Sequence, residues 1–219
     1  MIRQILHGKN FFKEEFGIDV NNLWLPDVFG YSAALPQILK KSGINYFLTQ
    51  KLSWSQFNEF PHHTFNWRGI DGAEILTHFP PENTYNSELD SEFLVPAQTH
   101  FKEKDFIDEF ISLFGVGDGG GGPKPENIEL GHRMADLENS PRVAFDTAKN
   151  FFDRLANHEK DVDTWVGELY LELHRGTLTT QALVKKQNRK LEWKLRSVEM
   201  LWSCLPLENY PFEELDDLW

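Results

Sequence analysis

Apolar and polar positions follow a helical period and then an extended one at the start of the chain. Residues 2–16 repeat apolar side chains at helical spacing, with lysines and glutamates between them, and Gly17 follows as a stop signal. The three apolar residues 23–25 have the character of the end of a buried strand, and Pro26 closes it because proline has no amide hydrogen to donate. The pattern predicts a helix followed by a strand, which is the repeating step of an α/β fold.

The same alternation continues as far as residue 176. We predict helices over 33–41, 124–139 and around 151–155, strands over 44–49, 75–79, 143–145 and 165–171, a turn at 67–72, and a helix or helix-plus-strand over 102–114. Helices between strands imply parallel strands joined by crossovers. The expected fold class is α/β, with a mostly parallel sheet or partial barrel and surrounding helices.

The last part of the chain changes to a helical period alone. Residues 179–203 carry an apolar stripe, with Lys and Arg side chains mainly off it, and residues 212–219 begin another amphipathic helix. A solvated helix face explains these cations better than contact with nucleic acid. We therefore predict an α/β catalytic domain over 1–176 and the start of a helical bundle, as a middle domain, over 177–219.

Charge and composition exclude several classes of partner. The net charge of −12 argues against nucleic acid and anionic lipid, and 14% aromatic residues are compatible with a neutral sugar ligand. The single cysteine, Cys204, excludes a disulfide framework and a cysteine-based zinc site. No signal peptide or membrane span is visible, so we expect a cytoplasmic protein.

Asp27 is the first candidate for chemistry, because it directly follows the strand that Pro26 closes. A carboxylate among Trp24, Phe29 and Tyr31 is costly unless a cation faces it. The carboxyl-terminal rim of a parallel sheet is also where α/β folds bind ligands. On the local pattern alone, Asp27 equally suits a cap on the helix that follows.

Three other segments carry polar side chains of interest. Tyr85 and Asn86 lie in a proline-containing rim loop and could hydrogen-bond sugar hydroxyls. His62 and His63 are adjacent, so they point to different sides of an extended chain and suit hydrogen bonding better than metal binding. Arg68, in the 67–72 turn, is expected to form a salt bridge at the rim.

A glycine-rich segment allows two interpretations. Gly115, Gly117 and Gly120 match the spacing of a dinucleotide-binding fingerprint, although a lone match is weak. Asp118 places negative charge where a pyrophosphate would lie, and Pro123 removes a donor and suits the first position of a helix. We favour a loop whose backbone approaches a ligand closely and presents Asp118 over it.

Four blocks of sequence occur at 24–38, 64–72, 117–123 and 168–177, and the first contains Trp-Leu-Pro-Asp-Val-Phe-Gly-Tyr-Ser. In this order they resemble glycoside hydrolase family 38, the retaining α-mannosidases, and within it the cytosolic and bacterial type. The resemblance runs nearly end to end. It implies that the chain is an internal fragment of the catalytic region of a much longer enzyme.

The resemblance implies zinc-dependent, retaining hydrolysis of terminal α-D-mannosides from glycans. Asp27 would be the nucleophile and a zinc ligand, and Asp118 the acid/base, although the family often has Gly-Asp-Asp where this chain has one aspartate. Substrate contact is implied for Phe29, Tyr85, Asn86, His174 and Arg175. The other Zn²⁺ ligands would lie before Met1 and after Trp219, so we expect this chain alone to bind metal weakly and to be inactive.

A second hypothesis is a non-catalytic α/β module that binds carbohydrate or a protein partner. Under the first hypothesis the partner is a mannose-containing oligosaccharide, with neither nucleic acid nor membrane involved, and a homo-oligomer is compatible with the sequence.

Overall fold

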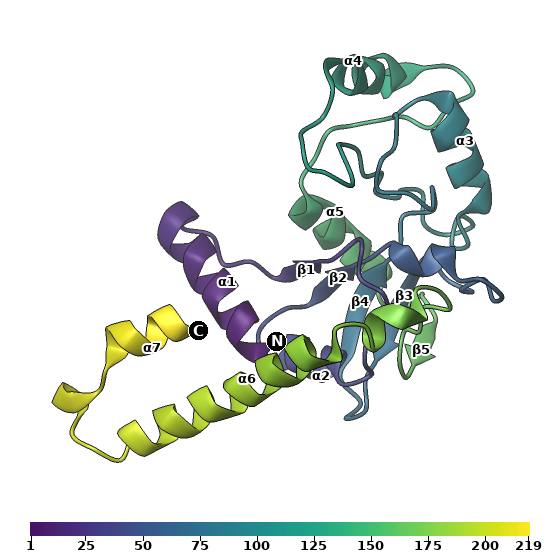
Figure 1. Cartoon of the computed structure of the whole chain (residues 1–219). Coiled ribbons are helices and arrows are strands. Elements are labelled where there is room, and N and C mark those ends of the chain that lie inside the picture. The colour runs from purple at the N-terminus through teal and green to yellow at the C-terminus, as the bar shows by residue number, and fades with distance from the viewer. The chain divides into compact units, whose positions relative to one another are not determined.

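A five-stranded sheet forms the centre of the first unit of the chain. The computed structural model describes residues 1–219, which divide into the units Met1–Leu173 and His174–Trp219. The strands lie in the order β1 (Asn22–Trp24), β2 (Tyr46–Leu48), β4 (Glu74–His78), β3 (Thr64–Arg68) and β5 (Thr164–Val166) (Figure 1). All neighbouring pairs are parallel except β3 and β4. The predicted α/β class with a mostly parallel sheet is confirmed.

The antiparallel pair arises from the predicted turn at 67–72. Gly69 N–H donates to the Ala73 carbonyl at 2.9 Å, which closes a hairpin between β3 and β4. Arg68 and Glu74 face each other across the pair, and Arg68 Nε donates to Glu74 Oε1 at 2.7 Å. The predicted salt bridge of Arg68 is therefore confirmed.

The helices of the first unit agree with the periodicity except in the middle of the chain. They are α1 (Ile2–Phe16), α2 (Leu35–Lys41), α3 (Ser91–His100), α4 (Pro125–Arg133) and α5 (Ala148–Leu155), with 3₁₀ turns η1 (Lys51–Trp54), η2 (Met134–Asp136) and η3 (Ala156–His158). Gly17 ends α1 with a left-handed φ of 69°. The apolar periodicity did not predict α3, which contains Pro96. This helix begins after the cap residue Asp90, whose carboxylate accepts from two backbone N–H groups.

Two predicted elements are wrong. Residues 102–114 form turns and irregular chain instead of a helix or strand. Ile107 and Leu113 are buried there, so the apolar pattern records core packing without regular structure. The predicted strand at 143–145 is also irregular: Val143 N–H donates to the Met134 carbonyl, so it joins α4 and η2 and not the sheet.

The core lies on both faces of the sheet. Adjacent residues of a strand point to opposite faces. Phe47 and Ile75 belong to one buried cluster, whereas their neighbours Leu48 and Leu76 belong to another. The first cluster includes Trp67, which is fully buried and donates its indole N–H to the Gly167 carbonyl at 2.7 Å. Both faces are therefore covered, as a sheet with parallel strands requires.

The second unit is helical. It contains η4 (Arg175–Leu178), α6 (Ala182–Trp202), η5 (Leu207–Asn209) and α7 (Phe212–Leu218). The indole N–H of Trp219 donates to Glu199 on α6 at 3.0 Å. In neither unit does a helix combine the length and the apolar character needed to cross a lipid bilayer.

A buried polar cluster joins the start of β3 to the irregular segment after α3. Glu103 accepts from the backbone N–H of His63 and Thr64, and His63 Nδ1 accepts from Lys102 N–H at 3.1 Å. Burial, reinforced by the charge of Lys102, lowers the pKa of His63 to about 4. Burial raises the pKa of Glu103 to about 7. His63 thus has the hydrogen-bonding role predicted for it.

His63 gives the fold a defined sensitivity to acid. Its folded pKa lies below the ordinary 6.5, so only the unfolded chain binds this proton between about pH 6.5 and 4, and the contribution of His63 to stability falls as pH falls through that window. The loss approaches about 3 kcal/mol. We expect His63→Asn, which keeps an acceptor for Lys102, to remove this loss, so that its free energy of unfolding by urea rises relative to that of the parent as pH falls through this window. The raised pKa of Glu103 acts in the opposite sense and is present in both proteins. His7→Asn, on exposed α1, should leave the profile unchanged, and an unaltered His63→Asn profile would contradict the prediction.

Candidate active site

The site begins where β1 and β2 end. Leu25 N–H donates to the Leu48 carbonyl at 3.0 Å, and the Pro26 carbonyl accepts from both Gln50 N–H (3.2 Å) and Lys51 N–H (3.0 Å). Because the strands are parallel, their carboxyl ends lie at the same edge of the sheet. The main chain therefore places the residues after β1 beside those after β2.

Asp27 faces a buried lysine at this edge. Lys51 Nζ is 2.8 Å from Asp27 Oδ1, and the Lys51 side chain is only 5% exposed whereas that of Asp27 is 42% exposed. The ammonium also lies 3.4 Å from the centroid of the Trp54 ring and 5.4 Å from that of Phe29. Asp27 thus has the cation that its surroundings were predicted to require.

The alternative of Asp27 as a helix cap is wrong. The residue that precedes α2 is Ala34, and no side chain caps that helix. Lys51 was missed in the sequence, although the signal was present: like Asp27, it is a charged residue a few positions after an apolar strand.

Tyr85 links Asp27 to the second predicted carboxylate. Its ring centroid is 5.8 Å from Lys51 Nζ. Burial raises the pKa of Tyr85, Lys51 opposes this, and the negative charges of Asp27 and Asp118 add to the increase. Both carboxylates, from segments far apart in the sequence, are therefore near enough to act on the same phenol.

The loops that carry Tyr85 and Asp118 are packed against each other. Ser87 N–H donates to the Leu113 carbonyl at 2.8 Å. A Cβ at Gly117 would lie 2.5 Å from Asn86 Nδ2, so only glycine allows Asn86 to lie where it does. The glycine-rich loop thus closely approaches Asn86, and its approach to a ligand stays a prediction. The dinucleotide interpretation does not fit, because no strand precedes the loop and α4 begins later, with Pro125 in the first turn where Pro123 had been expected.

A cavity of about 1180 Å³ lies beside these residues. Trp24, Pro26, Tyr85 and Asn86 line it, together with aromatic rings that include Phe110. Asp27, Lys51 and Asp118 are not part of its lining, so the cavity adjoins the carboxylates without enclosing them. Aromatic and amide groups in a cavity are suited to the apolar faces and the hydroxyls of a sugar.

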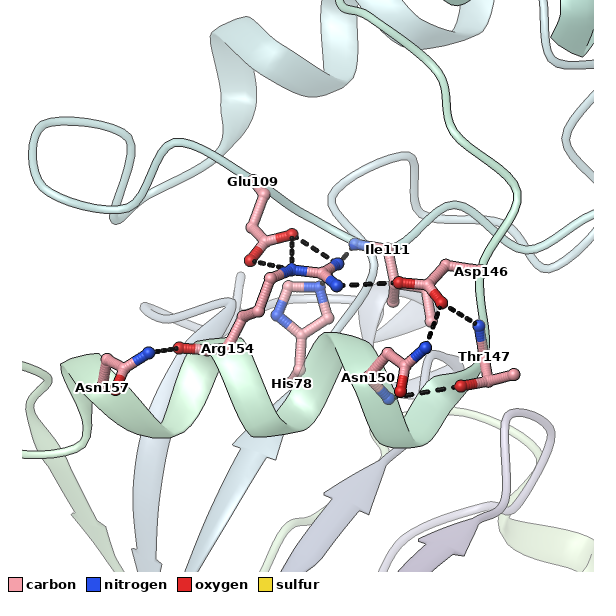
Figure 2. Close-up of polar contacts among 8 residues, drawn as sticks. All are labelled: His78, Glu109, Ile111, Asp146, Thr147, Asn150, Arg154 and Asn157. Carbon is pink, nitrogen blue, oxygen red and sulfur yellow. Dashed lines mark hydrogen bonds and ion pairs between the residues drawn. The ribbon is translucent and has the colours of Figure 1, made fainter.

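An ion-pair network forms part of the cavity wall. Figure 2 shows Arg154 between Glu109 and Asp146: its Nε donates to both Glu109 oxygens, and its Nη1 donates to Asp146 Oδ2 at 2.7 Å. The Arg154 guanidinium is the main reason that the pKa of Asp146 falls to about 2. Asp146 also accepts from Thr147 N–H and Asn150 Nδ2 at the start of α5. These groups satisfy one another, so the network supports the wall.

The donor set of the described chain does not by itself fit a zinc site. No group of three or more His, Cys, Asp or Glu side chains is arranged to hold a metal ion. Asp27 is the predicted ligand, and its Oδ1 is already paired with an ammonium. A protein zinc site normally takes three or four side-chain ligands.

The remaining predicted site residues fall into two groups. Phe29 and Tyr85 are half-buried near Lys51. Asn86 is exposed, and its amide group lies next to Gly117. His174 and Arg175 are exposed and open the second unit, where His174 has a left-handed φ of 52° before η4. Their contact with substrate stays a prediction, as do the roles of Asp27 and Asp118.

Two family models match consecutive parts of the chain. Residues 1–168 match the glycosyl hydrolases family 38 N-terminal domain, and residues 172–219 match the alpha mannosidase middle domain. Over its whole length the chain is 47% identical to alpha-mannosidase G of Dictyostelium discoideum, 44% identical to human alpha-mannosidase 2C1 and 40% identical to the alpha-mannosidase of Saccharomyces cerevisiae. It covers 20%, 21% and 22% of these relatives, so it spans about a fifth of their length.

A solved structure shares the fold. The alpha-mannosidase of Enterococcus faecalis V583 superimposes with a TM-score of 0.58 at 16% sequence identity, over 77% of this chain and 20% of that one.

Proposed function

Because this chain belongs to glycosyl hydrolase family 38, we propose that it supplies two catalytic carboxylates to an enzyme that hydrolyses terminal α-D-mannosides of glycans with retention of configuration. Relatives named alpha-mannosidases match this chain over its whole length. We assign Asp27 as the nucleophile and Asp118 as the acid/base.

The reaction has two steps in this assignment. An Asp27 oxygen attacks the anomeric carbon, the glycosidic bond breaks, and the Asp118 carboxyl group gives its proton to the leaving oxygen. A water molecule then attacks the same carbon, Asp118 takes its proton, and the bond to Asp27 breaks to release mannose and restore the carboxylate. The retained configuration results from two successive inversions.

One observation carries the assignment. Asp27 is paired with Lys51, whose ammonium is 5.8 Å from the centroid of the Tyr85 ring, and Gly117 closely approaches Asn86, the neighbour of Tyr85. The segments of Asp27 and Asp118, 91 positions apart in the sequence, therefore meet at Tyr85 and Asn86. Retaining glycosidases need two carboxyl groups on either side of one bond. The cavity beside Tyr85 and Asn86 offers room for the sugar, and the same two side chains, with Phe29, are the substrate contacts that we propose in the first unit.

Zinc dependence is a separate part of the proposal. Asp27 would be one Zn²⁺ ligand, and the others would have to come from outside these 219 residues, because the described donor set does not complete a site. When bound, the metal would hold sugar hydroxyls and stabilise developing charge. We expect dialysis against a chelator to abolish activity, and Zn²⁺ to restore it.

The test uses the full-length protein expressed from its own gene, since the chain spans about a fifth of its relatives. We expect it to hydrolyse an aryl α-D-mannoside and to leave the matching α-D-glucoside intact. Proton NMR of the fresh product should show the α-anomer of mannose first. A β-anomer as first product would exclude Asp27 as a nucleophile that forms a glycosyl-enzyme. The absence of hydrolysis would favour the non-catalytic binding module. Cytoplasmic location and self-association stay predictions of the sequence.

A further inference from the structure

Lys51 is a buried cation held against one carboxylate. Its side chain is 5% exposed, and its ammonium is 2.8 Å from Asp27 Oδ1 with the Trp54 ring face 3.4 Å away. Lysine ammonium groups normally remain in water because their desolvation is costly. A lysine that is buried at this position therefore depends on the negative charge of Asp27.

The main chain fixes this pairing. Lys51 N–H and Gln50 N–H donate to the Pro26 carbonyl, one residue before Asp27. The ammonium is 2.8 Å from the Oδ1 atom of Asp27. The Asp27 side chain is 42% exposed, so the ion pair leaves part of the carboxylate open to a substrate.

We propose that Lys51 is a positioning residue that acts through its ion pair with Asp27 and favours the second reaction step, in which Asp27 becomes a carboxylate again. The inference rests on the proposed role of Asp27 as nucleophile. In that step water bonds to the anomeric carbon and loses a proton to Asp118. The bond between this carbon and the Asp27 oxygen breaks, and its electron pair returns to Asp27.

The change in charge at Asp27 determines which reaction step Lys51 accelerates. As an ester in the glycosyl-enzyme, Asp27 is neutral and the buried ammonium has lost its counter-ion. Hydrolysis restores the ion pair, so Lys51 stabilises the departing carboxylate. Without Lys51 the ester should break down more slowly, and it should form no more slowly, because ester formation then no longer has to break an ion pair. It should accumulate, and kcat and KM should then fall together with little change in kcat/KM.

The experiment compares Lys51→Met with the parent in the full-length protein, with an aryl α-D-mannoside that has a good leaving group. We expect kcat to fall about 10-fold or more, the scale of one charge-assisted hydrogen bond, and KM to fall by a similar factor. Stopped-flow should show a burst of aryl alcohol equal to the enzyme concentration. Lys51→Arg, which keeps the cation, should recover most of kcat. Lys41→Met, which removes an exposed lysine paired with Asp71, should change neither constant.

If Lys51→Met lost kcat/KM without a burst and had a lower melting temperature, Lys51 would only support the fold. An unchanged kcat in Lys51→Met would also overturn the proposal. If Lys51→Met does not give folded protein, Lys51→Gln is judged by the same criteria. Asp27→Asn distinguishes failure of the proposed function from failure of this inference. Full activity of Asp27→Asn would exclude Asp27 as the nucleophile. An inactive Asp27→Asn together with a normal Lys51→Met would exclude only the role of Lys51.

Discussion

Asp27→Asn in the full-length protein is expected to lower kcat/KM for an aryl α-D-mannoside by about 10⁴-fold or more, the scale seen when a nucleophile is removed. The amide cannot form the glycosyl ester, but its oxygen can still accept from the Lys51 ammonium, which lies 2.8 Å from Oδ1 of the carboxylate. The fold should therefore survive the change, with a lower melting temperature because the buried ammonium loses its counter-charge. Steady-state kinetics give the loss, and thermal unfolding shows whether the variant is native.

The matched control for this variant is Asp19→Asn. Asp19 is also an aspartate paired with a lysine, Lys9, but its side chain is 75% exposed and lies just after α1. We expect its activity to equal that of the parent. Asp27→Asn activity within about tenfold of the parent would exclude Asp27 as the nucleophile, since an uncatalysed attack could not sustain that rate.

Asp118→Ala should lower kcat/KM by about 10²- to 10⁴-fold for a mannoside with a poor leaving group, the usual contribution of an acid/base. The loss should be much smaller for an activated aryl leaving group, because that group departs without a proton. Azide ion should restore turnover on the activated substrate, since it attacks the glycosyl-enzyme without a base and gives an α-mannosyl azide.

Asp136→Ala provides the comparison, because Asp136 is an exposed carboxylate in a surface ion pair with Arg142. It should be as active as the parent and indifferent to azide. If Asp118→Ala lost equal activity on both substrates and did not respond to azide, Asp118 would be a structural residue of the glycine-rich loop.

The periodic parts of the sequence predicted the fold well. The helix over 2–16 occurs as Ile2–Phe16, and the hairpin turn lies where Gly69 and Gly72 punctuate the pattern. The pattern failed between α3 and α4. There, apolar residues such as Ile107 are buried in irregular chain, whose backbone groups bond to other loops, and Pro96 obscured a helix that Asp90 caps. Periodicity reports regular structure only where the core contacts are regular.

The candidate site was likewise predictable only where its residues follow a local sequence pattern. Asp27 and Tyr85 stand out because each follows an apolar strand and a proline. Lys51 could not be paired with Asp27 from the sequence, because the pairing depends on the register of two parallel strands joined by a helix. The contact of Asn86 with Gly117 likewise depends on the packing of two loops, which no local pattern records.

The carbonyl of Pro26 has a consequence for how this scaffold can change. It accepts from two successive amides, those of Gln50 and Lys51, and thereby couples the exits of β1 and β2 directly. The separation of the two charged side chains is then independent of the length of the connection between the strands. Insertions between α2 and β2 would lengthen a surface crossover at a small entropic cost and leave the charged pair intact. One residue added between Trp24 and Asp27 would shift the carboxylate relative to its cation.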